Sequence, residues 1–357
     1  MQVRYPAAML RLVASALVVV VACTVPSAAQ TPVDAGALLT RYLHGERTLA
    51  LPATFDAKAF AASVSDAVDK GLPGPPEAAR RATAAFMLEA AAARLDDGDI
   101  RGSRTLLEWA CGRVRIQAVA DDFDRAWHDA ALSIAEGFLD PVALEAHIQH
   151  TRAFLPGSPR LALAWAVAAE QRASPVLMPQ QGSDSSATNP ALRADNQARL
   201  DASIGRLQDD ALERFAVAAA APETAADARV RVAHIQMMRG RAQDALTTLA
   251  AIEVATREGW LIYLARLFRG QALERLKNMD DAETSFRDAL KIGPGGQTAT
   301  MSLATLLYRR GHRDEAESLV QSLLDETDPI SDPWWTYWGG SARLWTQRLS
   351  VMRGLLQ

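Results

Sequence analysis

The chain has 357 residues, a formal net charge of −4 and a hydrophobic fraction of 49%, which is enough to bury a large core. Alanine, the strongest helix former, supplies much of that fraction, with runs at 90–93 and 218–221, and β-branched alternation is scarce beyond the N-terminus. The sequence therefore predicts an all-α protein. Its negative charge argues against a nucleic-acid partner, because binding to the phosphate backbone needs a basic surface.

The first residues have the pattern of an export signal. Two basic residues, Arg4 and Arg11, lie before an apolar core at 12–22, and small residues follow that core just before Gln30. We therefore expect a signal peptide at 1–29 and a mature protein that is periplasmic or associated with the outer membrane. A second interpretation is a lipid anchor, because the four residues that end at Cys23 resemble a bacterial lipobox. Neither interpretation includes a membrane-spanning helix.

The chain before residue 226 is predicted to be mostly helical. Residues 30–76 form an N-terminal helical unit that closes at a break rich in proline and glycine. Residues 77–172 have helix pairs of repeat-like length, which we interpret as divergent repeats; the alternative is an unrelated helical domain. The polar stretch 173–190 is expected to be an exposed loop, and 191–225 a degenerate repeat. The helices expected here span 33–43, 55–68, 77–95, 103–114, 122–138, 141–154, 160–172 and 191–221.

The C-terminal half contains an internal repeat with a period of about 34 residues. Its three units are 226–259, 263–296 and 297–330. The clearest copy carries Gly270, Ala282, Phe286, Ala289 and Pro294. Small residues let two helices approach closely where they cross, so we expect one at each crossing. The other two copies place small residues at the equivalent positions Ala233, Ala245, Ala304 and Ala316.

These positions resemble the signature of the tetratricopeptide repeat family, in which each unit is a pair of antiparallel helices. The resemblance covers 226–330 and is incomplete. No unit has the family's tryptophan near its start, Arg269 stands where leucine is usual, and Leu273 and Leu307 replace an aromatic residue. The resemblance implies a right-handed superhelical solenoid, because one helix pair cannot bury its apolar face alone.

In the family, the first helix of each unit lines a concave groove that receives a peptide or a partner helix. Carried over to this chain, the groove positions are His234, Met237, Met238, Gln271, Glu274, Arg275, Met301, Thr305, Tyr308 and Arg309. The alternative is that the methionines belong to the core and that the charged residues are merely solvated.

The last segment, 331–357, is rich in tryptophan and includes a predicted helix at 341–356. Because a repeat array exposes apolar surface at its end, we expect this segment to be a cap on the final unit. The alternative is an aromatic platform that binds a sugar or a peptide. The aromatic residues concerned are Trp334, Trp335, Tyr337, Trp338 and Trp345.

No pattern of catalytic chemistry is evident in the sequence. His147 and His150 are spaced to share a helix face, but the glutamate and third ligand of a zinc site are missing. Cys111 lies in an apolar helical pattern and is interpreted as a buried, inert thiol. We therefore expect no enzyme, metal or cofactor, but a protein–protein interaction scaffold of the bacterial cell envelope. The alternative is a glycan-binding or enzymatic protein that uses the tryptophan-rich segment and the 173–190 loop.

Overall fold

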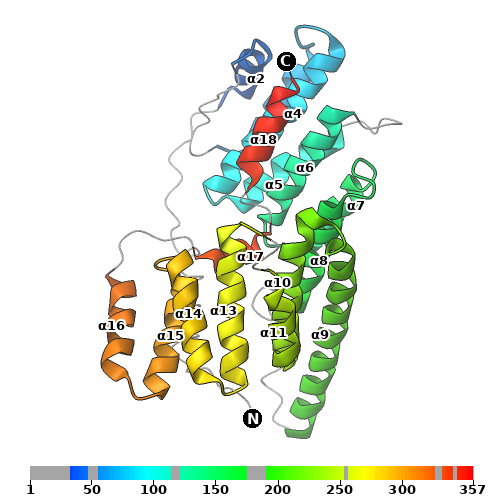
Figure 1. Ribbon diagram of the computed structural model, residues 1–357. Helices are drawn as coiled ribbons and strands as arrows, with labels where there is room; N and C mark the ends of the chain where they lie inside the picture. Colours follow the sequence, from blue (N-terminus) through cyan, green and yellow to red (C-terminus); the bar gives the residue numbers. More distant parts are fainter. Residues whose placement is uncertain are drawn as a thin grey trace.

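The computed structural model describes residues 33–46, 55–113, 121–174, 190–252, 256–325, 332–340 and 344–356. Within these ranges the chain forms 16 helices and no strand, so the predicted all-α class is confirmed (Figure 1). The predicted signal peptide, Cys23 and most of the predicted 173–190 loop lie outside the described residues.

The first half of the chain follows the predicted helices within a few residues. The helices are α2 (Ala35–Leu43), α3 (Ala57–Asp69), α4 (Pro76–Asp96), α5 (Ile100–Arg113), α6 (Asp122–Glu136), α7 (Pro141–Thr151) and α8 (Pro159–Ala173). Local sequence explains where several of them begin. Asp140 and Ser158 accept hydrogen bonds from the backbone of the first turns of α7 and α8, and a proline follows each cap.

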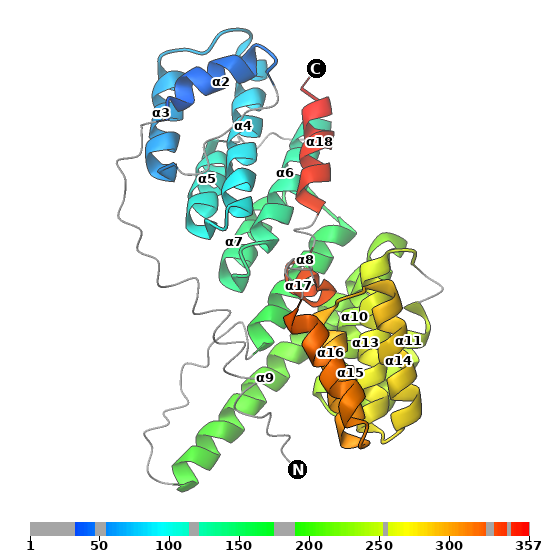
Figure 2. The same cartoon turned by 90° about the vertical axis from the view of Figure 1, so that its left-hand side faces the viewer.

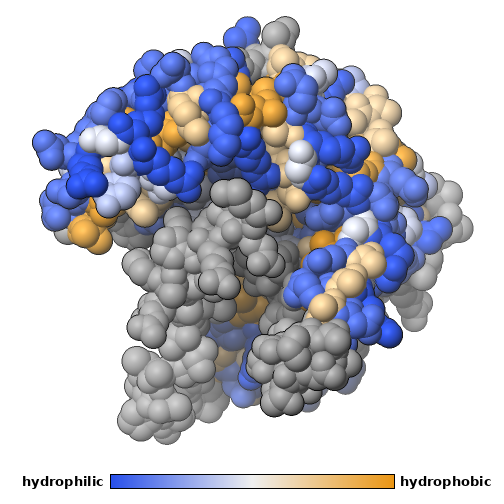
Figure 3. All heavy atoms as spheres, turned by 90° about the horizontal axis from the view of Figure 1, so that it is seen from below, coloured by the Kyte–Doolittle hydropathy of each residue, from blue (hydrophilic) through white to orange (hydrophobic). Residues whose placement is uncertain are grey.

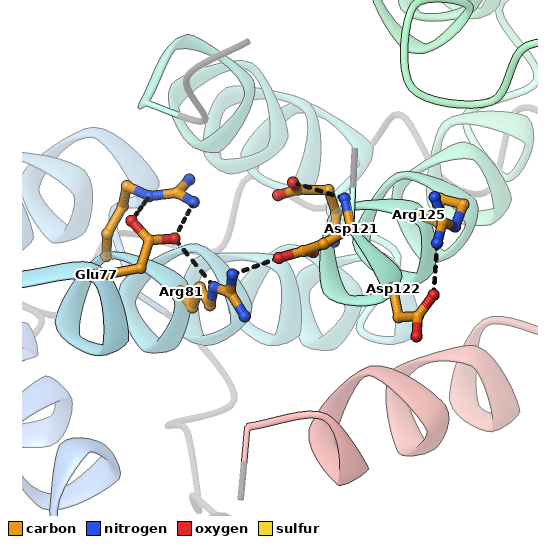
Figure 4. Close-up of polar contacts among 7 residues, drawn as sticks. Glu77, Arg81, Asp121, Asp122 and Arg125 are labelled. Carbon is orange, nitrogen blue, oxygen red and sulfur yellow. Dashed lines mark hydrogen bonds and ion pairs between the residues drawn. The ribbon is translucent and has the colours of Figure 1, made fainter. Parts of the chain in front are cut away.

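Neighbouring helices in this half pack side by side, α4 with α5, α6 with α7, and α7 with α8. An ion pair also joins α4 to the start of α6. Arg81 donates to Glu77 one turn away, at 3.0 Å, and to Asp121, which caps α6 (Figure 4). The cap of one helix is thereby fixed by a side chain of another.

The second half begins with the long helix α9 (Pro190–Ala218), which packs along α8 and carries Ala211 and Phe215 into their shared core. We had expected 191–225 to be a repeat of its own, but α9 instead completes a pair with α8. In Figure 2, the N-terminal end of α9 extends away from the other helices. The remaining helices of this half are α10 (Pro222–Met238), α11 (Ala242–Ala250), α13 (Gly259–Arg275), α14 (Met279–Ile292), α15 (Gln297–Arg309) and α16 (Arg313–Leu324).

These six helices form three consecutive packed pairs, one for each predicted unit, and neighbouring pairs pack on each other. The predicted small residues lie at the helix contacts. Ala233, Ala245 and Ala282 are fully buried, and a Cβ atom added to Gly270 would lie 2.5 Å from the Phe286 ring. These small residues therefore let the two helices of a pair approach closely.

The chain then turns back along the molecule. The short helix α17 (Pro333–Trp338) packs against α13, and α18 (Trp345–Gly354) packs against α6 and α4 (Figures 1 and 2). We had expected this segment to cap the last unit. Instead, Tyr337 and Trp338 join the core of the repeats, while Leu349 and Met352 join the core of the N-terminal helices.

No helix among the described residues is long and apolar enough to cross a membrane, in agreement with the prediction of no membrane span. On the face seen in Figure 3, hydrophilic residues cover most of the described surface, and apolar residues form small separate patches. The large apolar side chains are mainly inside, in the cores just described.

Candidate partner-binding face

The first helices of the three units, α10, α13 and α15, present a common side to the returning C-terminal segment; we call this side the first-helix face. Its predicted positions follow helical spacing. His234 and Met238 are one turn apart on α10, and Met301, Thr305 and Tyr308 follow one another along α15. The tryptophan-rich helix α17 occupies one part of this face, and several of the other predicted positions are exposed.

His234 is the point at which two separately predicted sets of residues meet. Its ring stacks on Phe268 of α13, with a centroid distance of 5.0 Å. It also packs edge-on against Trp334, Tyr337 and Trp338, at 5.4, 5.3 and 6.1 Å. His234, predicted for the groove, and the aromatic residues of α17, predicted for the cap or platform, thus form one packed cluster. The histidine ring meets the α17 rings in the edge-to-face arrangement that aromatic pairs prefer.

A buried ionic network lies beneath these rings. Arg231 is fully buried, pairs with Glu170 of α8 at 3.1 Å and with Asp227 at 2.7 Å, and donates to the carbonyl of Tyr337 at 2.6 Å. The Tyr337 hydroxyl donates to Glu170 and lies 2.9 Å from His234 Nδ1. Gln171 donates to the carbonyl of Trp338 at 2.8 Å. Side chains of α8 and α10 therefore bind the backbone of α17 directly.

The electrostatics of this network keep Glu170 and Arg231 ionised and the Tyr337 hydroxyl protonated. Burial by itself would raise the pKa of Glu170, but the hydrogen bond with His234 and the charge of Arg231 hold it below its ordinary value. Burial likewise opposes the charge of Arg231, yet Asp227 and Glu170 raise its pKa. Burial and the neighbouring Glu170 carboxylate raise the pKa of Tyr337 well above its ordinary value, so its hydroxyl stays a donor.

The rest of the first-helix face is open. Met238 and Tyr308 are 52% and 57% exposed, and Thr305, Arg275 and Arg309 are also exposed. Two contacts join neighbouring helices here: Arg309 pairs with Glu274, and Arg275 donates to the carbonyl of Met237. These contacts link α15 to α13 and α13 to α10, and they leave the two arginine side chains exposed.

Besides His234, four predicted groove positions do not belong to the open surface. Met237 is buried in the repeat core, which corrects its assignment to the groove and agrees with the alternative that methionine here is core. Gln271, Glu274 and Met301 are half-buried. Of the aromatic residues, Tyr337 is fully buried and Trp338 is 5% exposed, whereas Trp335 is 52% exposed. Trp345 lies apart, packed against the N-terminal core.

Sequence reasoning missed Arg231, Glu170 and Gln171, which anchor α17. A signal was present, because each interrupts an apolar stretch of a helix: Arg231 stands between Val230 and Val232, and the other two follow a run of small residues. Charged residues in such surroundings are expected only where they are paired.

The residues that the sequence singled out for chemistry, Cys111 and the pair His147 and His150, lie on α5 and α7. Burial raises the pKa of the Cys111 thiol to about 12, which favours the protonated thiol, and its Sγ lies 3.8 Å from His147 Nδ1. His147 and His150 pack near His128, a residue that the sequence did not connect with them. In the part of the chain that the structure describes, no group of histidine, cysteine and acidic side chains is placed to hold a metal ion.

Comparison with protein-family models and with curated proteins found no match for this chain.

Proposed function

We propose that this protein is a non-catalytic interaction scaffold of the cell envelope, built as a superhelix of tetratricopeptide type, and that it binds a peptide or partner protein on the open part of the first-helix face. The apolar leader at 1–29 supports export, either as a cleaved signal or as a lipid anchor at Cys23. The 34-residue spacing of small residues supports the repeat type.

One observation carries the binding proposal: this face already binds a short aromatic helix of its own chain. Side chains of α8 and α10 hold the α17 backbone, and rings of α10 and α13 pack on its tryptophans. On the last turns of α13 and α15, the exposed Arg275, Tyr308 and Arg309 offer the residue types that dominate protein interfaces. The same chemistry can therefore bind a second peptide on this part of the first-helix face.

Site-specific cross-linking tests this proposal. A photo-reactive amino acid at Tyr308 should cross-link a defined partner in intact cells, and one at the exposed Gln321 of α16 should not. Arg309→Ala should weaken capture of that partner about tenfold, a typical loss for an interface arginine. Arg287→Ala is the matched control, because Arg287 is a partly exposed arginine whose ion pair joins α14 to α16, as that of Arg309 joins α15 to α13. Equal cross-linking from both positions would refute the binding face.

The alternative function, glycan binding on the aromatic segment, has less support. A sugar platform needs exposed ring faces, and burial removes Tyr337 and Trp338 from that role. Trp335 is the most exposed aromatic side chain of α17. Quenching of tryptophan fluorescence by an oligosaccharide, abolished by Trp335→Ala, would favour this alternative over the scaffold.

A further inference from the structure

Helix α7 and the turn after it link α6 to α8, and we call these residues, 141–158, the α7 segment. The helix packs on both neighbours. The backbone is left-handed just before the segment at Leu139, with φ 52°, and again near its end at Gly157, with φ 69°. A leucine rarely adopts this conformation, so the chain is strained where the segment begins. The apolar side chains that the segment buries include Leu144, Ile148, Phe154 and Leu155.

Three histidines lie where this segment packs on α6. His147 and His150 are one turn apart on α7, and His128 comes from α6. The ring of His128 lies 5.5 Å from that of His150 and stacks on Phe154 at 3.7 Å. Four nitrogens of the three rings are buried and have no hydrogen-bond partner among the described residues. A displacement of the α7 segment from α6 would therefore bring water to all three rings at once.

Around this cluster, the described carboxylates pair with arginines and not with the histidines. From α5, the Cys111 Sγ lies 3.8 Å from His147 Nδ1. On α6, Asp124 lies one turn before His128, but its charge acts on Arg80 of α4. The ion pairs of the packed helices α4, α5, α6, α7, α8 and α18 that lie nearest are Arg81–Asp121, Arg104–Glu108, Arg104–Asp140, Arg160–Asp129, Arg160–Glu136, Arg172–Glu145 and Arg348–Asp129.

Protons therefore bind the open state of the segment better than the closed one. Burial lowers the pKa of His128 to about 2 and that of His147 to about 3, and it also lowers the pKa of His150. A solvated histidine has a pKa of about 6.5, so acid favours opening below that pH, and neither state binds these protons well above it. At pH 4.5 the opening equilibrium gains about a hundredfold from His128 and again from His147. These factors multiply, because one displacement hydrates both rings.

We propose that the α7 segment is an acid-sensitive switch: protonation of the histidine cluster releases the segment from α6 and loosens the link to α8, while α13 and α14 stay folded. Release exposes the apolar side chains of Leu144, Ile148 and Phe154 in mild acid. The switch is separate from the partner-binding face, because α7 contributes no residue to that face.

Hydrogen exchange of the full chain at pH 7 and pH 4.5, corrected for the intrinsic effect of pH on exchange, tests the proposal. We expect the opening equilibrium of residues 141–158 to rise by about a thousandfold or more, and α13 and α14 to keep their protection. His128→Leu should reduce that rise by about a hundredfold, because one titrating ring is removed. His312→Leu is the matched control, since His312 is exposed and should not affect the rise.

The same measurement separates a switch from acid denaturation. A return to pH 7 should restore the protection of the segment. Equal protection of the segment at both pH values would overturn the proposal, and so would loss of protection in α7, α13 and α14 together. If His128→Leu does not fold, His147→Leu provides the second test, because it removes the other strongly shifted ring. A rise in either folded variant equal to that of the wild type would also overturn the proposal.

Discussion

Arg231 and Glu170 are the residues on which the packing of the tryptophan-rich segment depends. Both are buried, and each remains charged because it has an oppositely charged partner and further hydrogen bonds. Buried ion pairs add little net stability, but breaking one leaves an unpaired buried charge at a high cost. The network therefore acts mainly on specificity, since only one position of α17 places the Tyr337 carbonyl against Arg231.

Three histidines near Phe154, namely His128, His147 and His150, are the other unusual residues, because each has a buried ring nitrogen without a hydrogen-bond partner among the described residues. Both ring nitrogens of His128 are without a partner, and its ring stacks on Phe154 at 3.7 Å. Burial lowers the pKa of His128 to about 2 and that of His147 to about 3, and it also lowers the pKa of His150. The folded protein thus keeps these rings neutral where the unfolded chain protonates them.

This difference predicts a loss of stability in mild acid. Below about pH 6.5, the unfolded chain binds protons that the folded state refuses, so stability falls by up to about 1.4 kcal/mol per pH unit for each histidine. Between pH 6 and pH 4, the unfolding free energy of the wild type should fall. His128→Leu should reduce that fall by about the amount that one buried histidine contributes. Urea unfolding at several pH values measures it.

The exposed His312 provides the control for that measurement. His312→Leu should leave the pH dependence of stability as it is in the wild type, because the ring is solvated in both states. An identical pH dependence for His128→Leu and the wild type would contradict the role of burial.

Helix pairs are the elements that the repeat pattern specifies, and the contact at Gly270 shows how. Phe286 of α14 packs onto the backbone of α13 at this glycine, where a Cβ atom would lie 2.5 Å from the ring. Glycine lowers helix propensity, so its presence inside α13 is accounted for by this close approach.

Gly270→Ala should therefore destabilise the protein by about 1–3 kcal/mol, because overpacking at the Phe286 ring outweighs the gain in helix propensity. Gly205→Ala is the matched change: Gly205 lies inside α9 with open space around its Cα, so alanine should stabilise by up to about 1 kcal/mol. Chemical denaturation of both variants gives the comparison. Stabilisation by both would contradict the close contact.

The α8–α9 pair shows the limit of reasoning from the pattern of elements. Both helices were predicted, and α9 extends over almost the expected residues. The polar stretch between them suggested a boundary, yet Leu163 and Val167 of α8 share a core with Phe215 of α9. A long connection does not determine whether the helices at its ends pack together, because loop closure costs little extra as a loop grows.

At the scale of the molecule, the C-terminal segment ties the two halves together. Its α17 joins the repeat core and its α18 joins the N-terminal core, so residues at the end of the chain close contacts with residues from its beginning. Leu349 is 3% exposed and Met352 fully buried against that core.

Met352→Ala should cost about 2–5 kcal/mol in the stability of the N-terminal helices, the usual cost of emptying a buried methionine site. Hydrogen exchange should speed up in α4 and α6, on which α18 packs, and much less in α13 and α14. Val351→Ala, at a residue that is 58% exposed, should change neither. Equal acceleration in all helices would mean that the two halves unfold as one unit.

The sequence by itself determined the all-α class, most helix boundaries and the small residues at the helix contacts, because caps, prolines and helical periodicity act over a few residues. Only the tertiary structure decided that α8 pairs with α9, that α17 lies on the first-helix face rather than on the last unit, and that His128 joins the other histidines. These depend on which buried charges and rings find partners far away in the chain. A charged residue in an apolar stretch indicates that it has a partner but not which residue supplies it, since any suitably placed group of opposite charge satisfies the same side chain.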